Sequence, residues 1–495
     1  MKKETIFKWL EACVILGIGF VLIVGILYKS GVMKSGYHFL DDHEVVRMEM
    51  AFKSGTATVM EQMNAWLQND LSWRFRPFYW AERVVGSYLF GADMLLWNLY
   101  TAVKGVLSFV LLYYVARYLG HNIMISTLFP GIIMLGAQFT PWYRSANQEN
   151  TGLLFVAVVL YLITRQYAKK KFRCPVYNVL IVVFTILCGL VKESFAMCIP
   201  AFMALKFWLE YCEAGKEAGE YQKVSYLAVF KKNIWTYAAM FLVGIADLLC
   251  IMFLVGVDNV SYAGFQEGTS LKDYINGISN SLTVYLKWYT LFGVMISFIV
   301  LMCYQLISKK FWKQYLGFGL IGFYIIGIQL LAHAKSLMWE RYIIPCIIGY
   351  ALVFVLLGYD LFRKHVFQRR VYTGILVLLL ILEVPMAYDK AKAWAYDGQM
   401  IAQYFQCILD NSTPEDVILC GFSDEELNLS SDYWLDAHER PNVEYYQGGV
   451  INTDAYAAVT CYNNQVAGMV AMLEASGELS YSVFEYMNYA VIVLK

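Results

Sequence analysis

The sequence predicts an all-α polytopic membrane protein that carries a small α/β domain at its C-terminal end. Hydrophobic residues make up 59% of the 495 residues and charged residues only 16%, whereas a soluble domain is roughly half apolar and a quarter charged. Long apolar runs recur up to residue 387, and beyond it the hydropathy falls and short strand-like segments appear. The net charge is zero, so nothing indicates a nucleic-acid partner.

Roughly 20 apolar residues are needed to cross the hydrocarbon core of a bilayer, and about eleven runs approach this length. They cover residues 9–28, 93–115, 122–140, 151–166, 176–191, 194–210, 234–256, 284–307, 313–332, 342–359 and 371–387. The first run follows three lysines and is not followed by a small-residue cleavage site. We therefore expect a retained anchor rather than a removed signal peptide.

The basic connections predict the orientation of the chain. With a cytoplasmic N-terminus, the segments RQYAKKKFRC, SKKFWKQ and LFRKHVFQRR all lie on the cytoplasmic side, as the positive-inside rule requires. The long first loop (29–92) and the C-terminal region then lie outside. We expect two domains, a transmembrane module over 1–387 and an extracytoplasmic α/β domain over 388–495. In the second domain, an amphipathic helix is marked by Trp394, Ile401, Tyr404, Phe405 and Ile408, VILCGF, NVEYY and YAVIVL form strands, and QVAGMVAMLEA forms another helix.

The first outer loop has a helical pattern. Apolar residues recur at helical spacing over 45–52 and again over 59–67, which predicts two amphipathic helices along the membrane surface. Thr58 and Glu61 match a capping box at the start of the second helix.

An acidic pair, Asp41 and Asp42, opens this loop and is followed by His43. One interpretation is structural, because Asp41 with Glu44 three residues later resembles a helix cap. The other is chemical, because a partly desolvated carboxylate can act as a general base. The residues alone leave both interpretations open.

Cationic side chains gather on the same predicted face. Arg74 and Arg76 alternate in the segment RFRP, so in an extended chain they point the same way and can hold a phosphate. The alternative is that they contact lipid headgroups or pair with Asp70 and Glu82. Further cations are Lys192 in the turn VKES, and Lys335 and Arg341, which bracket the segment HAKSLMWERYIIP. A lone cation near a bilayer is usually a snorkelling anchor, but this grouping opposes the positive-inside bias and favours anion binding.

The order of these features resembles the GT-C superfamily. These are integral-membrane glycosyltransferases that take sugars from polyprenyl-phosphate carriers, and the protein-mannosyl and aminoarabinose transferases belong among them. The resemblance covers residues 1 to about 387 and rests on an acidic pair in the first outer loop, the RFRP segment, a KE turn and a late RYxxP. It implies a GT-C-like fold. It also implies roles for individual residues: Asp41 or Asp42 as catalytic base, Arg74, Arg76, Lys192, Lys335 and Arg341 as binders of the donor phosphate, and His43, Glu193 and Tyr342 as supporting residues.

The implied activity is inverting glycosyl transfer from a polyprenyl-phosphate-linked sugar to an envelope glycan, lipid or protein acceptor outside the cytoplasm. A base takes the acceptor proton, and fixed cations stabilise the charge on the leaving phosphate. Membrane lipids are the other expected partners. No cofactor is indicated. The sequence shows no metal-ligand spacing, so a divalent metal is not indicated either, and whether the reaction requires one stays open.

Two other classes compete with this function. A transporter or flippase of a lipid-linked or small anionic substrate is suggested by Lys104 and Asp247, which lie near the middle of predicted spans. They could instead form one structural ion pair, and no internal duplication supports transport. A polysaccharide polymerase or ligase would also use outer-face arginines, but we would expect its large charged loop late in the chain.

Overall fold

The structure is a computed structural model that describes residues 2–39, 41–144, 147–218, 224–256, 270–286, 299, 313–334, 340–449, 451–476 and 480–494. The chain divides into two compact units. The first unit is Met1–Ile26, Trp66–Trp80 and Thr101–Lys390, and the second is Leu27–Ala65, Ala81–Tyr100 and Ala391–Lys495. The predicted domain boundary after residue 387 stays a prediction.

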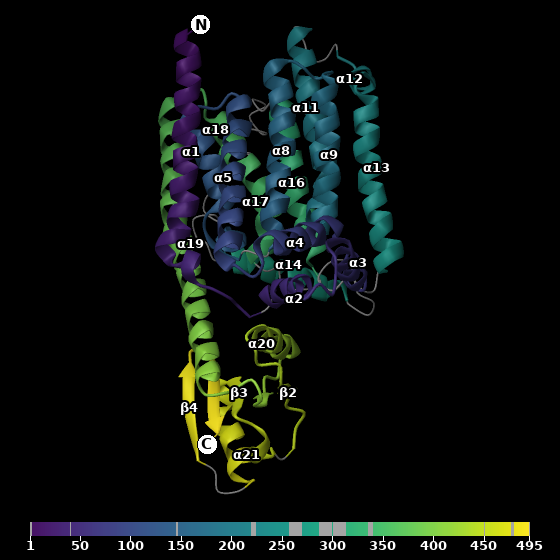
Figure 1. Ribbon diagram of the computed structural model, residues 1–495. Coiled ribbons are helices and arrows are strands. Elements are labelled where there is room, and N and C mark those ends of the chain that lie inside the picture. The colour runs from purple at the N-terminus through teal and green to yellow at the C-terminus, as the bar shows by residue number, and fades with distance from the viewer. Residues whose placement is uncertain are drawn as a thin grey trace. The chain divides into compact units, whose positions relative to one another are not determined.

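Long apolar helices dominate the first unit (Figure 1). Within the described residues, seven helices are long and apolar enough to cross a membrane, or up to eight if one bent pair counts as a span. These segments are α1 (Lys2–Ser30), α5 (Met94–Tyr118), α8 (Gln148–Lys169), α10 with α11 (Glu193–Ala196 and Ile199–Glu217), α13 with the π-helix η4 (Ile234–Cys250 and Ile251–Val255), η6 to α18 (Glu340–Leu361), and α19 (Val366–Asp410). The predicted membrane fold class is therefore confirmed.

The expected number of about eleven spans is not confirmed. The predicted spans at 176–191 and 313–332 correspond to the helices α9 (Pro175–Val191) and α16 (Lys313–Ala332), whose apolar stretches are shorter. The predicted span at 284–307 lies almost entirely outside the described residues. The segment from η6 to α18 consists of η6 (Glu340–Ile343), α17 (Ile344–Ala351), the π-helix η7 (Leu352–Leu357) and α18 (Gly358–Leu361). The shorter helices α12 (Tyr226–Lys232) and α14 (Leu271–Leu286) also belong to this unit.

The predicted span at 122–140 is broken in the structure. Helix α6 (Ile123–Met134) begins at Asn122, whose side chain accepts a hydrogen bond from the backbone N–H of Ile125. The following pair, η2 (Ala137–Phe139) and α7 (Thr140–Tyr143), is bent from α6 by 74°. Gly136 lies at the break with φ of 96°, a conformation that glycine adopts at little cost.

Helix α19 corrects a second expectation. The sequence predicted a span ending at residue 387 and a separate amphipathic helix marked by Trp394, Ile401, Tyr404, Phe405 and Ile408. The structure has one continuous helix of 45 residues, Val366–Asp410, with Pro385 inside it. The hydropathy falls along this helix, but the sequence there contains no cluster of turn residues that would end it.

The predicted first outer loop (29–92) contains the two predicted helices, α2 (Asp42–Lys53) and α3 (Val59–Asp70), and a third, α4 (Pro77–Phe90), that was not predicted. The capping box of α3 is present. The backbone N–H and the hydroxyl of Thr58 donate to Oε2 of Glu61 at 2.7 and 2.8 Å, and the backbone N–H of Glu61 donates to Oγ1 of Thr58 at 3.3 Å. A short 3₁₀-helix, η1 (Val32–Lys34), follows α1.

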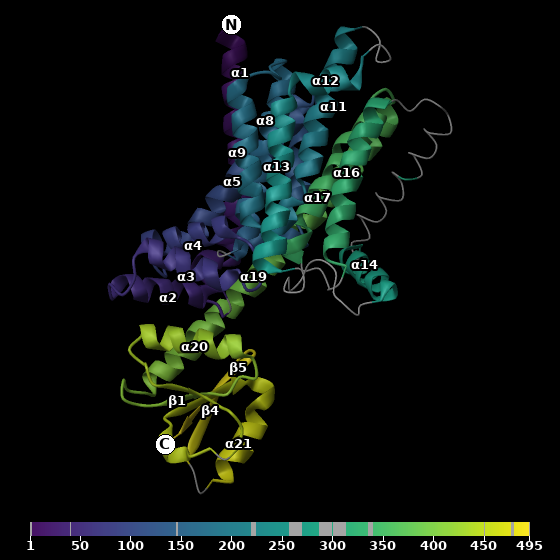
Figure 2. The ribbon, with the colours of Figure 1, turned by 90° about the vertical axis from the view of Figure 1, so that its right-hand side faces the viewer.

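The C-terminal residues form a small α/β domain, as predicted (Figure 2). Its sheet has the strand order β2-β1-β3-β5-β4. Strand β1 runs parallel to β2 and β3, and β5 runs antiparallel to β3 and β4. The elements are β1 (Ile418–Cys420), α20 (Glu425–Ala437), β2 (Val443–Tyr445), η8 (Thr453–Ala455), β3 (Ala458–Tyr462), η9 (Asn463–Gln465), α21 (Val466–Glu474), β4 (Tyr481–Tyr486) and β5 (Tyr489–Leu494). The predicted β1, β2, β5 and α21 are confirmed, whereas β3, β4 and α20 were missed.

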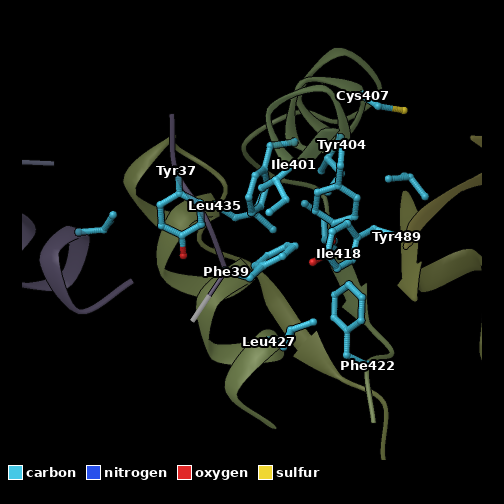
Figure 3. Close-up of a cluster of buried hydrophobic side chains, with 14 of the residues drawn as sticks. Tyr37, Phe39, Ile401, Tyr404, Cys407, Ile418, Phe422, Leu427, Leu435 and Tyr489 are labelled. Carbon is cyan, nitrogen blue, oxygen red and sulfur yellow. The ribbon is translucent and has the colours of Figure 1, made fainter. Parts of the chain in front are cut away.

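An aromatic core holds the second unit together (Figure 3). Phe39, which lies shortly before the acidic pair, packs with ring centroids 5.5 Å from Phe405 of α19 and 4.9 Å from Tyr489 of β5. Tyr37 donates a hydrogen bond from its hydroxyl to the carbonyl oxygen of Ser430 in α20 at 2.9 Å. The segment leading into the acidic pair is thereby anchored on the C-terminal domain.

Candidate active site

A buried ion pair lies at the centre of the candidate site in the first unit. Lys192 follows the last residue of α9, and Glu149 lies in the first turn of α8. Nζ of Lys192 is 2.5 Å from Oε1 of Glu149, and the two side chains are only 3% and 1% exposed. Because taking both charges out of water costs free energy, such a pair at the end of a helix bundle is a candidate for function.

Tyr342 connects Lys192 to Arg341. Nζ of Lys192 lies 3.6 Å from the centroid of the Tyr342 ring, and the guanidinium carbon of Arg341 lies 5.1 Å from it. Arg341 also donates one hydrogen bond to the hydroxyl of Tyr342 at 3.2 Å and another to Oδ1 of Asn147 at 2.9 Å. Cations over an aromatic face are attracted by the ring quadrupole, so this tyrosine holds both cations in one place.

Arg74 belongs to the same electrostatic group. Burial lowers the pKa of Lys192 to about 7; the Glu149 carboxylate opposes this shift, and the charges of Arg74 and Arg341 add to it. Arg74 itself is only 8% exposed. The structure therefore brings Arg74, Lys192 and Arg341 together, although they are far apart in the sequence.

Unlike Lys192 and Arg341, Arg76 pairs with the carboxylate of Asp70. Its guanidinium forms an ion pair with Asp70, donating through Nε at 3.1 Å and also through a second nitrogen, and it donates to Oε1 of Gln148 at 2.9 Å. Pairing with Asp70 was one of the two alternatives that the sequence left open. Glu193, another expected supporting residue, is buried at the start of α10. Lys335 lies outside the described residues.

Sequence reasoning missed three members of this group: Glu149, Asn147 and His333. His333 is 4% exposed and stacks on Tyr342, with ring centroids 5.4 Å apart. Neither of its ring nitrogens has a hydrogen-bond partner among the described residues. Burial, followed by the charges of Lys192 and Arg74, lowers the pKa of His333 to about 3, so the ring is neutral at pH 7. The available signal for Glu149 was the run NQENT, which places polar residues at the start of an apolar span.

The acidic pair lies in the second unit. Oδ2 of Asp42 accepts a hydrogen bond from the backbone N–H of His38 at 3.0 Å, and the side chain is only 7% exposed. Burial raises the pKa of Asp42, while His38 and Arg83 oppose the shift. The carboxylate of Asp42 thus holds the preceding segment in place.

Asp41 does not cap α2 with its side chain. It occupies the N-cap position with φ of 40° and ψ of −41°, and its side chain makes no capping hydrogen bond. The capping interpretation of Asp41 with Glu44 is therefore wrong. A non-glycine residue with such a φ costs on the order of 1–3 kcal/mol, and strain of this kind tends to occur at functional sites. Asp41 is half-buried and hence more accessible than Asp42.

Arg83 and His43 surround the acidic pair. Arg83 is almost fully buried, donates to the backbone carbonyl of Asp41, and lies with Nε 2.9 Å from Oε2 of Glu44. His43 shares a hydrogen bond of 3.0 Å between Nδ1 and the Ser430 hydroxyl. Burial, followed by the charge of Arg83, lowers the pKa of His43 to about 4. At pH 7 the neutral imidazole therefore connects α2 to α20.

Lys104 and Asp247, which lie near the middle of predicted spans, do not form an ion pair with each other. Lys104 donates to the hydroxyl of Thr151 at 2.9 Å. Asp247 is buried beside Gly189, and neither of its carboxylate oxygens has a hydrogen-bond partner among the described residues. Across the same described residues, no group of three or more His, Cys, Asp or Glu side chains is placed to hold a metal ion.

Known proteins resemble this chain in fold but not in sequence. No family model and no curated protein sequence matches it. Among solved structures, the crystal structure of ArnT from Cupriavidus metallidurans bound to undecaprenyl phosphate matches with a TM-score of 0.51 and 12% identity, over 98% of each chain. The chain shares the fold of ArnT. The predicted GT-C-like fold is thereby confirmed. The Archaeoglobus fulgidus oligosaccharyltransferase in complex with zinc and sulfate is less similar, with a TM-score of 0.46 and 12% identity over 98% of this chain and 73% of that one.

Proposed function

We propose that this protein is an inverting glycosyltransferase that moves a sugar from a polyprenyl-phosphate donor to an acceptor on the non-cytoplasmic side of the membrane. The observation that carries the proposal is the buried cationic group of Lys192, Arg341 and Arg74 around Tyr342. Support comes from the fold shared with ArnT, whose crystal structure contains undecaprenyl phosphate.

The charges of this group suit a phosphate. The charges of Arg74 and Arg341 act on Lys192 together with the carboxylate of Glu149, so several cations are in place where an anion can bind. Arg341 can bind phosphate oxygens through paired N–H groups, and Lys192 acts as a compact point charge. The neutral ring of His333 can donate one further hydrogen bond to a phosphate oxygen. In this proposal Glu149 keeps Lys192 in place when no donor is bound.

The same cations stabilise the reaction. The acceptor oxygen forms a bond to the anomeric carbon while the bond from that carbon to the phosphate oxygen breaks. The electron pair of the broken bond moves to the phosphate, whose negative charge increases, and fixed cations in a water-poor site stabilise that charge. Displacement from the opposite face inverts the anomeric configuration.

The acceptor proton requires a base, and we assign this role to Asp41. Both carboxylates of the pair are of the right chemical type, but Asp42 is buried and accepts the backbone N–H of His38. Asp41 is more accessible and has the strained backbone. We assign Arg76 a positioning role, because it contacts Gln148, the neighbour of Glu149.

The test is to incubate purified protein with polyprenyl-phosphate sugars and acceptor and to follow the lipids by mass spectrometry. We expect wild-type protein to convert the sugar-bearing lipid to free polyprenyl phosphate, and Lys192→Met to lose this conversion. If reconstituted protein moves the lipid across the bilayer chemically unchanged, the proposal is wrong and the transporter class is favoured.

A further inference from the structure

We propose that a polar cavity at the basic end of the helix bundle binds a phosphate-bearing ligand, independently of the glycosyl transfer proposed above. The cavity has a volume of about 380 Å³. It is lined by the connection between α8 and α9 (residues 170–174), by one face of α11, and by the junction of α12 and α13. All of these elements belong to the first unit, and the basic loops predict that this end is cytoplasmic.

The buried carboxylates of the cavity already have cationic partners. Oε1 of Glu213 lies 2.5 Å from Nζ of Lys170, and Oε2 lies 3.7 Å from Nζ of Lys216. Oε1 of Glu210 accepts a hydrogen bond from Lys206 at 2.6 Å. A third carboxylate of the lining, Glu217, is exposed and acts on Lys170. The charges of Glu210 and Glu213 are thus compensated by Lys206, Lys170 and Lys216, and Glu217 acts on the same Lys170.

Three cations remain available to a ligand. Lys171, Arg173 and Lys232 line the cavity, and none of them has an ion pair or side-chain hydrogen bond with the described part of the chain. They come from both sides of the cavity, the α8–α9 connection and the end of α12. Cations on two walls can contact different oxygens of one anion at the same time, which suits a phosphate group.

A buried polar network holds the floor of the cavity. Asn233 donates to Oε2 of Glu210 at 2.9 Å, and Gln166 donates to Oδ1 of Asn178 at 2.8 Å. Lys206 joins the two parts, because it donates to Gln166 at 2.9 Å as well as to Glu210. The floor is therefore fixed before a ligand arrives, which lowers the entropic cost of binding.

Helix ends of both kinds lie at the cavity. Cys174 and Asn233 line the cavity and occupy the N-cap positions of α9 and α13. The N-terminus of a helix carries a partial positive charge and the C-terminus a partial negative charge. Because α8 and α12 end beside the cavity, at Lys169 and Lys232, the preference for an anion comes from the cationic side chains and not from the helix dipoles. The ligand chemistry that fits is a phosphate group, supplied either by the headgroup of an anionic lipid or by a soluble phosphorylated compound.

The test uses the purified full-length protein and two probes, inorganic pyrophosphate and short-chain phosphatidylglycerol, with the Kd of each measured by titration of thermal stability. The test variant is Arg173→Gln with Lys232→Gln. The matched control is Arg370→Gln with Lys364→Gln, which removes one arginine and one lysine that do not line this cavity. Losing a charge-assisted contact weakens binding by about tenfold or more, so we expect the Kd to rise by about this factor only in the test variant.

The pattern of binding identifies the source of the phosphate. Binding of phosphatidylglycerol alone assigns the cavity to a lipid headgroup, and binding of pyrophosphate assigns it to a soluble phosphorylated compound. The proposal is overturned if neither probe stabilises wild-type protein, or if both variants lose binding equally, because the effect is then one of general surface charge. Unchanged circular dichroism of the test variant checks that it is folded.

Discussion

Lys192 and Glu149 form an ion pair that is almost completely buried, with Nζ and Oε1 2.5 Å apart. Removing one partner leaves the other charge buried without compensation, which typically costs about 3–5 kcal/mol, whereas replacing both with apolar residues is often neutral. We therefore expect Lys192→Met to lower the thermal stability of the purified protein more than the double variant Lys192→Met with Glu149→Met. Equal destabilisation by the single and double variants would contradict a buried, paired state.

The pKa of Lys192 predicts a pH dependence of donor use. Burial lowers this pKa to about 7, so the ammonium group is present below pH 7 and is lost as the pH rises through 7. Because the cation is needed to bind the donor phosphate in our proposal, kcat/KM for the donor should fall over that range. An arginine stays protonated, so Lys192→Arg should remove this alkaline decline. A decline that persists unchanged in Lys192→Arg would assign it to another group.

Arg341 provides a test of phosphate geometry. A guanidinium held by paired hydrogen bonds cannot be replaced by an ammonium group without loss of geometry. We expect Arg341→Lys to raise KM for the donor by about tenfold with little change in thermal stability. Arg370→Lys, at an exposed position near the start of α19, is the matched control and should leave KM unchanged. If both substitutions behave alike, Arg341 is only an interfacial anchor.

The orientation of the chain can be tested by cysteine labelling in sealed vesicles. Ser54 and Ser423 are exposed residues of the first loop and of the C-terminal domain, and Ser225 is an exposed residue just before α12. In a background without native cysteines, we expect Ser54→Cys and Ser423→Cys to react from the non-cytoplasmic side and Ser225→Cys from the cytoplasmic side. Labelling of Ser54→Cys and Ser423→Cys from opposite faces would contradict the predicted topology.

Apolar runs, helical spacing and short strand patterns predicted most of the fold. Long apolar helices, α2, α3 and three strands of the C-terminal sheet could be recognised because each carries a local signal. The strands β3 and β4 and the helices α4 and α20 were missed. Helix α4 begins at Pro77 within a segment interpreted only through its arginines. The continuity of α19 could not be recognised because hydropathy changes along it although the backbone does not turn.

The candidate site was only partly predictable. Lys192 and Arg341 stood out because cations on the predicted outer face oppose the positive-inside bias. The partners of these cations depend on contacts between helices that are remote in sequence, so Glu149 and His333 could not be assigned. The same limitation applies to Arg76, whose binding to Asp70 and Gln148 appears only in three dimensions. The capping interpretation of Asp41 failed because spacing alone does not determine the backbone conformation.

The central claim is that Asp41 removes the acceptor proton during transfer from a polyprenyl phosphate. The most direct measurement is the rate of acceptor-dependent release of polyprenyl phosphate by wild-type protein, Asp41→Asn and Asp42→Asn, all purified and shown to be folded. Losing a general base typically costs about 10²–10⁴ in rate. Our account predicts a loss of this size in Asp41→Asn and a smaller one in Asp42→Asn, whereas wild-type rates in Asp41→Asn would contradict it.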